Sequence, residues 1–298
     1  MFKSGYVTII GRPNVGKSTL LNSIIGQKIS AISNKPQTTR DRITFIYTDE
    51  EAQIIFLDTP GIQKPKNKLG SFMLKTSEET LTEVDVITYL VDCSEKIGKM
   101  DSYIINFLTE HKEKNPNKPI ILLINKIDEI QKEKLFELIK MYDELNIFNE
   151  IIPISALKAD GIEEYLEVLK SYLSEGPMFY PEDMITDKTE KFIVAEIIRE
   201  KALRFLNEEI PHGVAVSIES MKERNNKIMD IEATIYVERE SHKGIIIGKA
   251  GSMLKKIGTS ARKEIEILLD EKVNLKLWVK VEKNWRDKEN KVKYFGYK

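Results

Sequence analysis

Cysteine is almost absent from this 298-residue sequence, in which Cys93 is the single example. One cysteine excludes a disulfide framework and a zinc site built from cysteines. Long apolar runs are also missing, since none approaches the roughly 18 residues that a membrane-spanning helix needs. The first five residues leave no room for a signal peptide before the first expected strand. We therefore expect a cytoplasmic protein.

The sequence also has almost no excess of charge of one sign. Its 46 Lys and Arg nearly balance its 47 Asp and Glu, which gives a net charge of −1. From Ser241 onward, however, 15 Lys and Arg face 7 Asp and Glu, so this end carries +8 and the first 240 residues carry −9. A basic end on an acidic body points to nucleic acid or anionic lipid as a partner. The length favours one large domain and a smaller one.

The most informative motif is Gly11-Arg12-Pro13-Asn14-Val15-Gly16-Lys17-Ser18-Thr19, which contains G-x-x-x-x-G-K-S. An apolar strand candidate, Tyr6 to Ile10, precedes it, and a helix-compatible stretch, Ser18 to Ile25, follows it. A glycine-rich turn between strand and helix aims backbone N–H groups and the positive end of a helix dipole at one point. Lys17 then reaches the β- and γ-phosphates, and the Ser18 hydroxyl ligates Mg²⁺. The sequence therefore predicts a nucleotide-binding loop.

Two further segments fit a magnesium-bound nucleotide. The polar loop Gln27 to Arg42 offers a threonine hydroxyl for the Mg²⁺ shell, from Thr39 as first choice or from Thr38 as the alternate. The strand Ile54 to Leu57 runs into Asp58-Thr59-Pro60-Gly61, whose carboxylate can hold Mg²⁺ through water and whose last N–H can meet the γ-phosphate. We assign metal binding to Ser18, Thr39 and Asp58. We assign catalysis to Lys17, Thr39 and Gly61.

Recognition of the base is predicted from two later loops. The strand Pro119 to Ile124 ends in Asn125-Lys126-Ile127-Asp128. Asp128 can accept two hydrogen bonds from guanine, whereas adenine would leave the carboxylate unpaired. The Lys126 stem can cover the ring, and Asn125 can tie this loop to the phosphate loop. After the strand Glu150 to Ile154, a backbone N–H of Ser155-Ala156-Leu157 can meet the guanine O6.

Strands alternate with helices through residues 1–174, which predicts an α/β domain with a mainly parallel sheet and helices on both faces. The motifs all follow the carboxyl ends of strands, where such sheets bind ligands. Gly176, Pro177 and Pro181 then predict a linker of moderate stiffness over residues 175–189. Residues 190–298 form the second predicted domain.

The second domain is expected to follow the order helix, strand, strand, helix, G-x-x-G loop, helix, strand. The helices are Lys191 to Leu206, a short one before the loop and one from Ser252, read as an N-cap. The strands are Val214 to Ile218, Ile228 to Val237 and Val273 to Val281. This is the order of an α+β type II KH domain, whose loop clamps the backbone of about four nucleotides of RNA. DNA is not expected as a partner. The predicted RNA-binding residues are Ile245, Ile246, Gly248, Lys249, Ala250 and Gly251.

The first domain resembles small GTPases of the translation-factor class, and its G-R-P-N-V-G-K-S and D-T-P-G motifs resemble the Era/EngA/TrmE branch. Ile62 stands where Ras-like proteins carry the glutamine that orients the attacking water, and an isoleucine cannot orient water. Gln63 and Arg40 are better read as surface switch residues, so we expect slow hydrolysis. The resemblance implies Mg²⁺. Several members of this branch also use K⁺ held near the residue equivalent to Asn14, which stays open here.

Over its whole length the chain resembles the Era family of ribosome-assembly GTPases, in which one GTPase domain precedes one KH domain. The EngA family has two GTPase domains and lacks this G-x-x-G loop. The resemblance implies binding to the 3′ end of small-subunit ribosomal RNA, assistance in assembly of the small ribosomal subunit, and a peripheral association with the inner membrane. The matching segments are Pro177 to Asp183, Thr186-Asp187, Glu196 to Lys201, Glu208 to Ala215 and Val279 to Trp285.

We interpret the chain as a GTP-hydrolysing switch whose nucleotide state, GTP or GDP, gates an RNA-binding module. The alternative is an interaction protein that docks on a membrane or protein partner and keeps the KH fold as a scaffold. The linker offers no polybasic cluster, and the chain has no lipidation motif. The RNA sequence, the direction of coupling and the oligomeric state stay open.

Overall fold

The computed structural model describes residues 1–31, 42–58, 67–206, 213–224 and 228–296. Its contacts divide the chain into two compact units, the first built mainly from residues up to Asp187 and the second mainly from Lys188 onward. In the part of the chain that the structure describes, no helix combines the length and the apolar character that crossing a bilayer requires.

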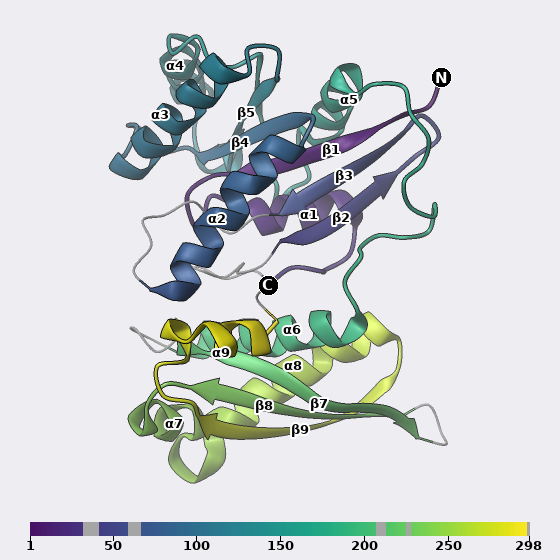
Figure 1. The fold of residues 1–298 in the computed structure, drawn as a ribbon, viewed down its shortest axis with the longest axis vertical. Coiled ribbons are helices and arrows are strands. Elements are labelled where there is room, and N and C mark those ends of the chain that lie inside the picture. The colour runs from purple at the N-terminus through teal and green to yellow at the C-terminus, as the bar shows by residue number, and fades with distance from the viewer. Residues whose placement is uncertain (32–41, 59–66, 207–212, 225–227, 297–298) are drawn as a thin grey trace. The chain divides into compact units, whose positions relative to one another are not determined.

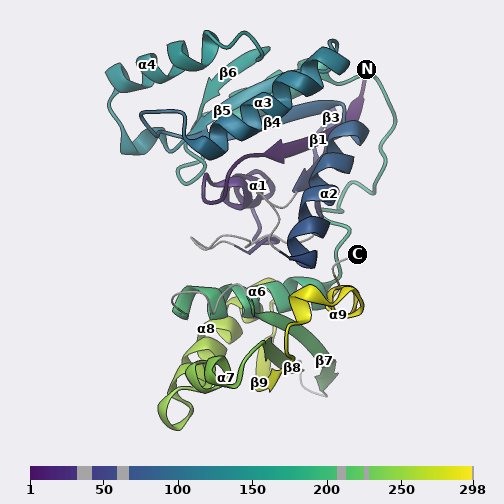
Figure 2. The same ribbon diagram turned by 60° about the vertical axis from the view of Figure 1, so that its left-hand side comes forward.

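The first unit is built around a six-stranded sheet in the order β2-β3-β1-β4-β5-β6 (Figures 1 and 2). β2 runs antiparallel to β3, and the other neighbouring strands are parallel. This confirms the predicted, mainly parallel α/β sheet. The strands are β1 Lys3–Ile10, β2 Ile43–Thr48, β3 Ala52–Asp58, β4 Val86–Asp92, β5 Ile120–Asn125 and β6 Glu150–Pro153.

Helices cover both faces of this sheet, with α2, α3 and α4 on one face and α1 and α5 on the other (Figures 1 and 2). The central strands are therefore buried on both sides, and every residue of β3 and β5 is buried. Only the strand ends and their loops are left to carry polar chemistry. The helices are α1 Lys17–Ile25, α2 Lys68–Glu83, α3 Lys99–Lys114, α4 Lys132–Asp143 and α5 Ile162–Tyr172, with a 3₁₀ turn η1 at Ile127–Glu129.

Part of the segment predicted as a linker follows the edge of this sheet. The Ile46 N–H of the edge strand β2 donates to the Ile185 carbonyl at 2.9 Å, and the Thr186 hydroxyl donates to the Thr44 carbonyl at 2.6 Å. The Gln53 amide accepts from the Phe179 N–H at 2.7 Å. The first two bonds occupy polar backbone groups of β2 that an edge strand would otherwise expose. Residues 179–187 thus stay with the first unit.

The second unit has a three-stranded sheet in the order β7-β8-β9, antiparallel between β7 and β8 and parallel between β8 and β9. The order of elements is the one predicted for a type II KH domain. β7 runs past the predicted end at Ile218, because an irregular register between Ile218 and Ser220 interrupts the alternation of apolar residues. The elements are α6 Glu190–Phe205, β7 Ala215–Arg224, β8 Ile228–Val237, α7 Glu240–Ile247, η3 Lys249–Gly251, α8 Ser252–Leu269, β9 Lys272–Val281, η4 Trp285–Asp287 and α9 Glu289–Tyr294.

An aromatic cluster anchors the end of the second unit. Trp285 is fully buried, and its indole N–H donates to the Gly213 carbonyl at 2.9 Å. Its ring meets Phe295 edge-on, and Phe295 also contacts Tyr236 of β8. Buried aromatic rings with their polar atom satisfied stabilise such a junction strongly.

Candidate nucleotide site and RNA interface

The phosphate loop between β1 and α1 has a backbone that only glycine permits at two positions. Gly16 has a φ of 107°, and a Cβ there would stand 2.2 Å from the Asn125 amide nitrogen. A Cβ on Gly11 would stand 2.4 Å from the Leu90 carbonyl oxygen. Both glycines of the motif are therefore required by close contacts within the protein, which hold the loop against β4 and β5.

The start of α1 suits an anion. Gly16 occupies the N-cap position and supplies no side-chain acceptor, and the first turn, which lies wholly within the described residues, carries no acidic residue. The N–H groups of a first helical turn lack partners within the helix and attract negative charge. A phosphate group would satisfy these donors.

Lys17 lies across this loop with only 8% of its surface exposed. Its ammonium donates to the carbonyls of Gly11 at 3.0 Å and Arg12 at 3.2 Å. Burial lowers the pKa of Lys17 to about 8, although the negative charge of Asp58 acts in the opposite direction. A buried ammonium with a lowered pKa gains from a nearby anion. Lys17 is thus placed and charged to receive a phosphate.

Asn125 joins three loops at the carboxyl end of the sheet. Its amide nitrogen donates to the Val15 carbonyl of the phosphate loop at 2.7 Å. Its amide oxygen accepts from the Ala156 N–H at 2.9 Å, and its backbone carbonyl accepts from the Cys93 thiol at 3.1 Å. The predicted connection between the base loop and the phosphate loop is present. The connection from Asn125 to Ala156 was not anticipated from the sequence.

Asp128 has a neighbour that the sequence pattern did not reveal. The Ser155 hydroxyl donates to one oxygen of its carboxylate at 2.6 Å, so the base loop and the loop after β6 meet there. Lys126 has a φ of 68°, in the left-handed region. The bond from Ser155 orients the Asp128 carboxylate and fits the predicted role of this carboxylate in reading a base edge.

The backbone after β6 is partly engaged within the protein. The Ser155 N–H donates to the Asp160 carbonyl at 3.0 Å, and the Ala156 N–H donates to Asn125. Leu157 is 75% exposed. The sequence predicts that a backbone N–H of Ser155, Ala156 or Leu157 bonds to the guanine O6. The N–H groups of Ser155 and Ala156 already donate to acceptors inside the protein.

Two of the predicted metal ligands lie in the described part of the chain. Asp58, fully buried, ends β3 beside Ile9 of β1, and Ser18 is the second residue of α1. A carboxylate and a hydroxyl are hard oxygen donors of the kind that suits Mg²⁺, which usually takes few protein ligands and completes its shell with phosphates and water. The donor set therefore fits Mg²⁺. The predicted residues outside the described ranges are Thr38, Thr39, Arg40, Thr59, Pro60, Gly61, Ile62 and Gln63.

Arg12 is part of the predicted nucleotide site, but its side chain binds within the protein. The guanidinium pairs with Asp92, and its Nε lies 3.1 Å from Asp101. A contribution of Arg12 to a nucleotide would therefore come from its backbone.

The G-x-x-G loop of the second unit is a tight left-handed turn between α7 and α8. Gly248, Ala250 and Gly251 have φ values of 73°, 50° and 78°. A Cβ on Gly248 would stand 2.7 Å from the Met253 Cβ. Ser252 is already helical, and Gly251 takes the position before α8, so the prediction of Ser252 as N-cap is wrong. Positive φ favours glycine at that position.

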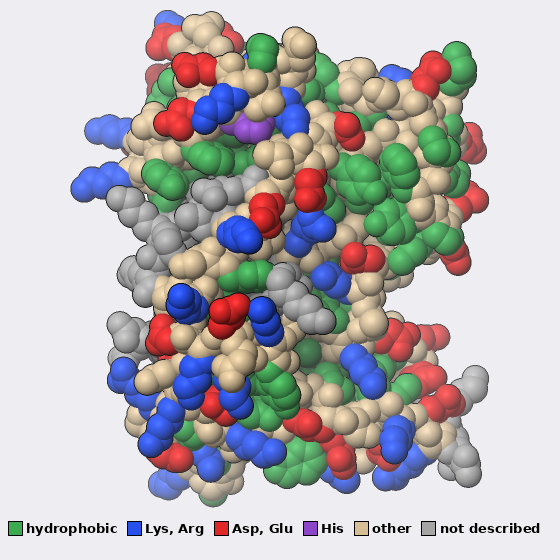
Figure 3. Space-filling view, in the orientation of Figure 1, with side chains coloured by type: hydrophobic (Ala, Val, Ile, Leu, Met, Phe, Trp, Pro, Cys, Tyr) green, Lys and Arg blue, Asp and Glu red, His purple; other side chains and the backbone are tan. Residues whose placement is uncertain are grey.

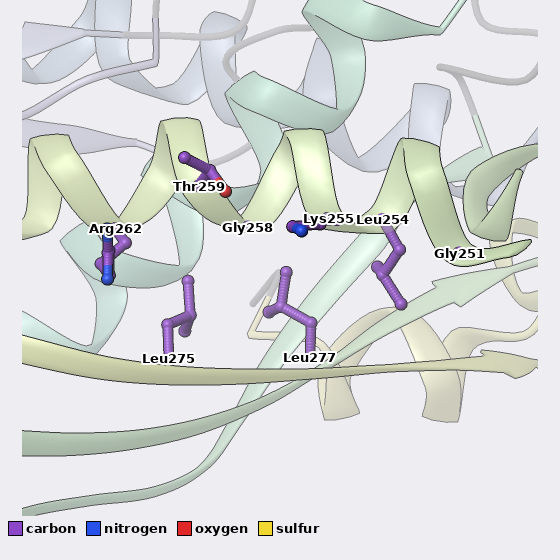
Figure 4. Close-up of a pocket in the computed structure, with 8 residues that line it drawn as sticks. All are labelled: Gly251, Leu254, Lys255, Gly258, Thr259, Arg262, Leu275 and Leu277. Atoms are coloured by element: carbon purple, nitrogen blue, oxygen red, sulfur yellow. The ribbon is translucent and has the colours of Figure 1, made fainter.

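Beside this loop, a groove of about 550 Å³ lies between α8 and β9. Figure 4 shows Leu275 and Leu277 pointing from β9 toward α8, with Leu254 pointing from α8 toward β9. A floor of leucines and a rim of basic side chains suits the bases and phosphates of a single strand. The residues that line the groove are Gly251, Leu254, Lys255, Gly258, Thr259, Arg262, Leu275 and Leu277.

The apolar residues before the loop divide between surface and core. Ile245 is 48% exposed, but Ile246 is fully buried. The predicted contact of Ile246 with RNA does not fit the structure, because its side chain belongs to the core. Leu254, Leu275 and Leu277 were not assigned from the sequence, although the apolar alternation of Leu275 and Leu277 on β9 was visible. On the face that Figure 3 shows, many Lys and Arg side chains lie on the second unit.

Family models match both units. Residues 6–126 match the model of the 50S ribosome-binding GTPase family, and residues 209–286 match the KH domain model. The first match ends just after Asn125, and the second contains the G-x-x-G loop. The first match thus includes the phosphate loop, and the second includes the G-x-x-G loop and the groove beside it.

Individual relatives match the chain from end to end. It is 58% identical to the GTPase Era of Clostridioides difficile strain 630, with 100% of this chain and 99% of the relative covered. The GTPase Era of Clostridium tetani strain Massachusetts is 54% identical, with both chains fully covered.

Two solved structures share the fold of both units. One is Era in complex with MgGDPNP and nucleotides 1506–1542 of 16S ribosomal RNA, with 44% identity, a TM-score of 0.93, and 100% of this chain and 99% of that chain covered. The other is a single-residue variant of Aquifex aeolicus Era bound to GDP·AlF4⁻, with the same identity and TM-score and 99% of each chain covered. With a nucleotide site and a KH groove in one chain, and full-length similarity of sequence and fold to these proteins, the chain is a GTPase of the Era family.

Proposed function

We propose that this chain is a GTP-hydrolysing switch that binds single-stranded RNA at the 3′ end of small-subunit ribosomal RNA and assists assembly of the small ribosomal subunit. One observation carries the proposal: a phosphate loop with a buried lysine and a G-x-x-G loop beside an apolar groove occur in one chain. Support comes from the similar Era protein that was crystallised with MgGDPNP and 16S ribosomal RNA.

On the nucleotide side, Lys17 contacts the β- and γ-phosphates, where its charge stabilises the negative charge of the transferring group. Asp128, oriented by Ser155, accepts from guanine, and Asn125 keeps the base loop and the phosphate loop in register. The Gly61 N–H, outside the described residues, is proposed to meet the γ-phosphate. Positioning of this kind supplies most of the catalysis in phosphoryl transfer.

Mg²⁺ would be held by Ser18 and Asp58, together with the Thr39 hydroxyl, which lies outside the described residues. When bound, the ion neutralises charge on the β- and γ-phosphate oxygens. Asp58 is fully buried at the end of a central strand, so its carboxylate is held in place before any ion arrives.

Hydrolysis is proposed to be slow, because Ile62 has no group to orient water. A potassium ion near Asn14, whose φ is 70°, is the proposed aid. We expect GTP turnover to be faster in KCl than in NaCl at equal ionic strength. Equal turnover in the two salts would remove K⁺ from the proposal.

The alternate Mg²⁺ ligand, Thr38, can be distinguished from Thr39 by the same turnover assay on the alanine variant of each threonine.

On the RNA side, the backbone of Gly248, Lys249, Ala250 and Gly251 clamps phosphates. Ile245 and the leucines of the groove contact bases, and Lys249, Lys255 and Arg262 add positive charge. Glycine is needed in the loop because phosphates approach the main chain closely.

The predicted peripheral membrane association stays a prediction, which flotation with anionic vesicles can test.

The proposal is tested by titrating the full chain with a labelled single strand that copies the 3′ end of small-subunit ribosomal RNA. A scrambled strand of equal composition is the control, and each titration is run with GDP and with a non-hydrolysable GTP analogue. We expect tighter binding of the native strand and a different affinity in the two nucleotide states. Equal, weak binding of both strands would instead favour the interaction-protein alternative.

A further inference from the structure

A carboxylate at the end of β4 lies between the two loops that the nucleotide is proposed to contact. Asp92 pairs with Arg12 of the phosphate loop, and its other oxygen lies 3.8 Å from the Lys126 ammonium of the base loop. The Ser94 hydroxyl donates to the Asp92 oxygen that pairs with Arg12, at 2.6 Å. The Asp92 side chain is only 15% exposed. One carboxylate thus contacts cations from both loops.

Arg12 has a second carboxylate partner. Its Nε lies 3.1 Å from Asp101, which sits in the first turn of α3 with a side chain 5% exposed. The buried Tyr89 hydroxyl donates to the same carboxylate at 2.9 Å. Burial and the charge of Asp101 raise the pKa of Tyr89 above its ordinary value, so this hydroxyl stays a donor. The guanidinium is therefore held from two sides.

The charge of Asp92 is secured by its surroundings. Partial burial acts to raise the pKa of Asp92, but hydrogen bonds from Ser94 and the positive charges of Arg12 and Lys126 outweigh it and lower the pKa. The carboxylate is thus ionised at neutral pH. Charge-assisted bonds in a partly buried place are stronger than those on an open surface.

The backbone of Arg12 connects this cluster to the phosphate-binding lysine. The Lys17 ammonium donates to the Arg12 carbonyl at 3.2 Å and to the neighbouring Gly11 carbonyl at 3.0 Å. A shift of Arg12 would therefore shift two acceptors of Lys17. Asp92 can influence phosphate binding in this way without contacting a phosphate.

We propose that Asp92 is a positioning residue for the nucleotide, which holds Arg12 and Lys126 at once and so keeps the phosphate loop and the base loop at a fixed separation. This inference rests on the proposed guanine-nucleotide site. It adds a role for a residue outside the nucleotide-binding motifs. Its consequence is that loss of Asp92 weakens binding at both ends of the nucleotide.

The test is Asp92→Asn, which keeps the side-chain shape and removes the charge. We expect GDP and a GTP analogue to bind about tenfold more weakly or worse, because two cations lose their shared partner. Turnover at saturating GTP should fall less than the affinity does, because Asp92 acts on Lys17 only through the backbone of Arg12. The preference for GDP over IDP, which lacks the exocyclic amine, should also fall. Glu95→Gln is the matched control, because Glu95 lies in the same loop but pairs with Lys134 on the open surface.

A double-mutant cycle separates positioning from a loss of general stability. If Asp92 acts through Arg12, the double variant Arg12→Gln with Asp92→Asn should bind GDP no more weakly than the worse single variant. Ser94→Ala, which removes one hydrogen bond to Asp92 without removing its charge, should weaken binding in the same direction by about threefold. It also serves as the readout if Asp92→Asn does not fold.

Three results would overturn the inference: unchanged GDP affinity in Asp92→Asn or, failing that variant, in Ser94→Ala; equal losses in kcat and affinity; or additive effects in the cycle. A parent chain that binds no GDP would instead overturn the nucleotide site itself.

Discussion

At the scale of one residue, Lys17 shows how a buried positive charge makes the nucleotide site favour anions. Its ammonium is almost excluded from water and bonded to two backbone carbonyls, and its pKa is lowered to about 8. A phosphate polyanion beside it would stabilise the charged form and raise this pKa. Nucleotide binding and proton binding should therefore be linked.

We expect GDP binding to take up protons just above pH 8. The free site there is partly deprotonated because its pKa is about 8, whereas the complex holds Lys17 charged. Affinity should consequently fall as the pH rises above this value. Calorimetry in two buffers of different ionisation enthalpy measures the uptake, and Lys17→Met should abolish it. No uptake by the parent chain would show that the lysine does not meet the phosphates.

Guanine selectivity should rest on Asp128. Asp128→Asn turns one acceptor oxygen into a donor that faces the donors of guanine, which should weaken GTP binding by roughly 2–4 kcal/mol. Xanthosine triphosphate carries a carbonyl at that edge and should bind the variant better than the parent does. The Ser155 hydroxyl can still donate to the remaining oxygen, so the loop should keep its position.

The matched control for Asp128→Asn is Glu129→Gln, which removes a carboxylate from the next, exposed residue. It should bind GTP as the parent does. If Asp128→Asn bound GTP normally and ignored the xanthine nucleotide, the base assignment would be wrong.

At the scale of elements, the turn between α7 and α8 is where RNA binding should be lost without loss of the fold. Lys249→Asp with Ala250→Asp keeps both glycines, and aspartate tolerates the left-handed conformation that Ala250 adopts at φ 50°. The pair removes one positive charge and adds two negative ones beside the phosphates. RNA binding should weaken by at least the free energy of one charge-assisted contact to phosphate, which is roughly 1.5–3 kcal/mol.

Two controls accompany this variant. Gln131→Asp with Lys132→Asp makes the same change in charge at the exposed start of α4 in the first unit. It should leave RNA affinity near that of the parent. GTP hydrolysis of the loop variant should also be near normal, and unaltered RNA affinity would count against the KH groove as the binding site.

At the scale of the whole molecule, an acidic first part and a basic end share one chain, with net charges of −9 and +8. Phosphate contacts release counterions, so the logarithm of the RNA affinity should fall linearly with the logarithm of the salt concentration. A clamp on about four nucleotides predicts a slope of about −2 to −3. Fluorescence titrations at four salt concentrations measure it, and a slope near zero would show that phosphates are not clamped.

Much of the fold and the core of the nucleotide site could be predicted because their signals are local. A glycine-rich turn between an apolar strand and a helix binds phosphate for reasons contained in nine consecutive residues. The order of strands and helices follows from apolar periodicity, and the comparison structures bear it out. The loop proposed to read the base was likewise located from four residues after a strand.

Other features depended on contacts between residues distant in sequence. The sequence determined that Arg12 stands in the phosphate loop, but only the tertiary structure placed Asp92 and Asp101, which lie 80 and 89 positions further along the sequence, around its guanidinium. It showed that Ile245 faces outward and Ile246 inward, because one short helix gives neighbours opposite environments. Local patterns determine which chemistry each loop can perform. Which loops act together is decided by the packing of the parallel strands, whose carboxyl ends bring those loops to one edge of the sheet.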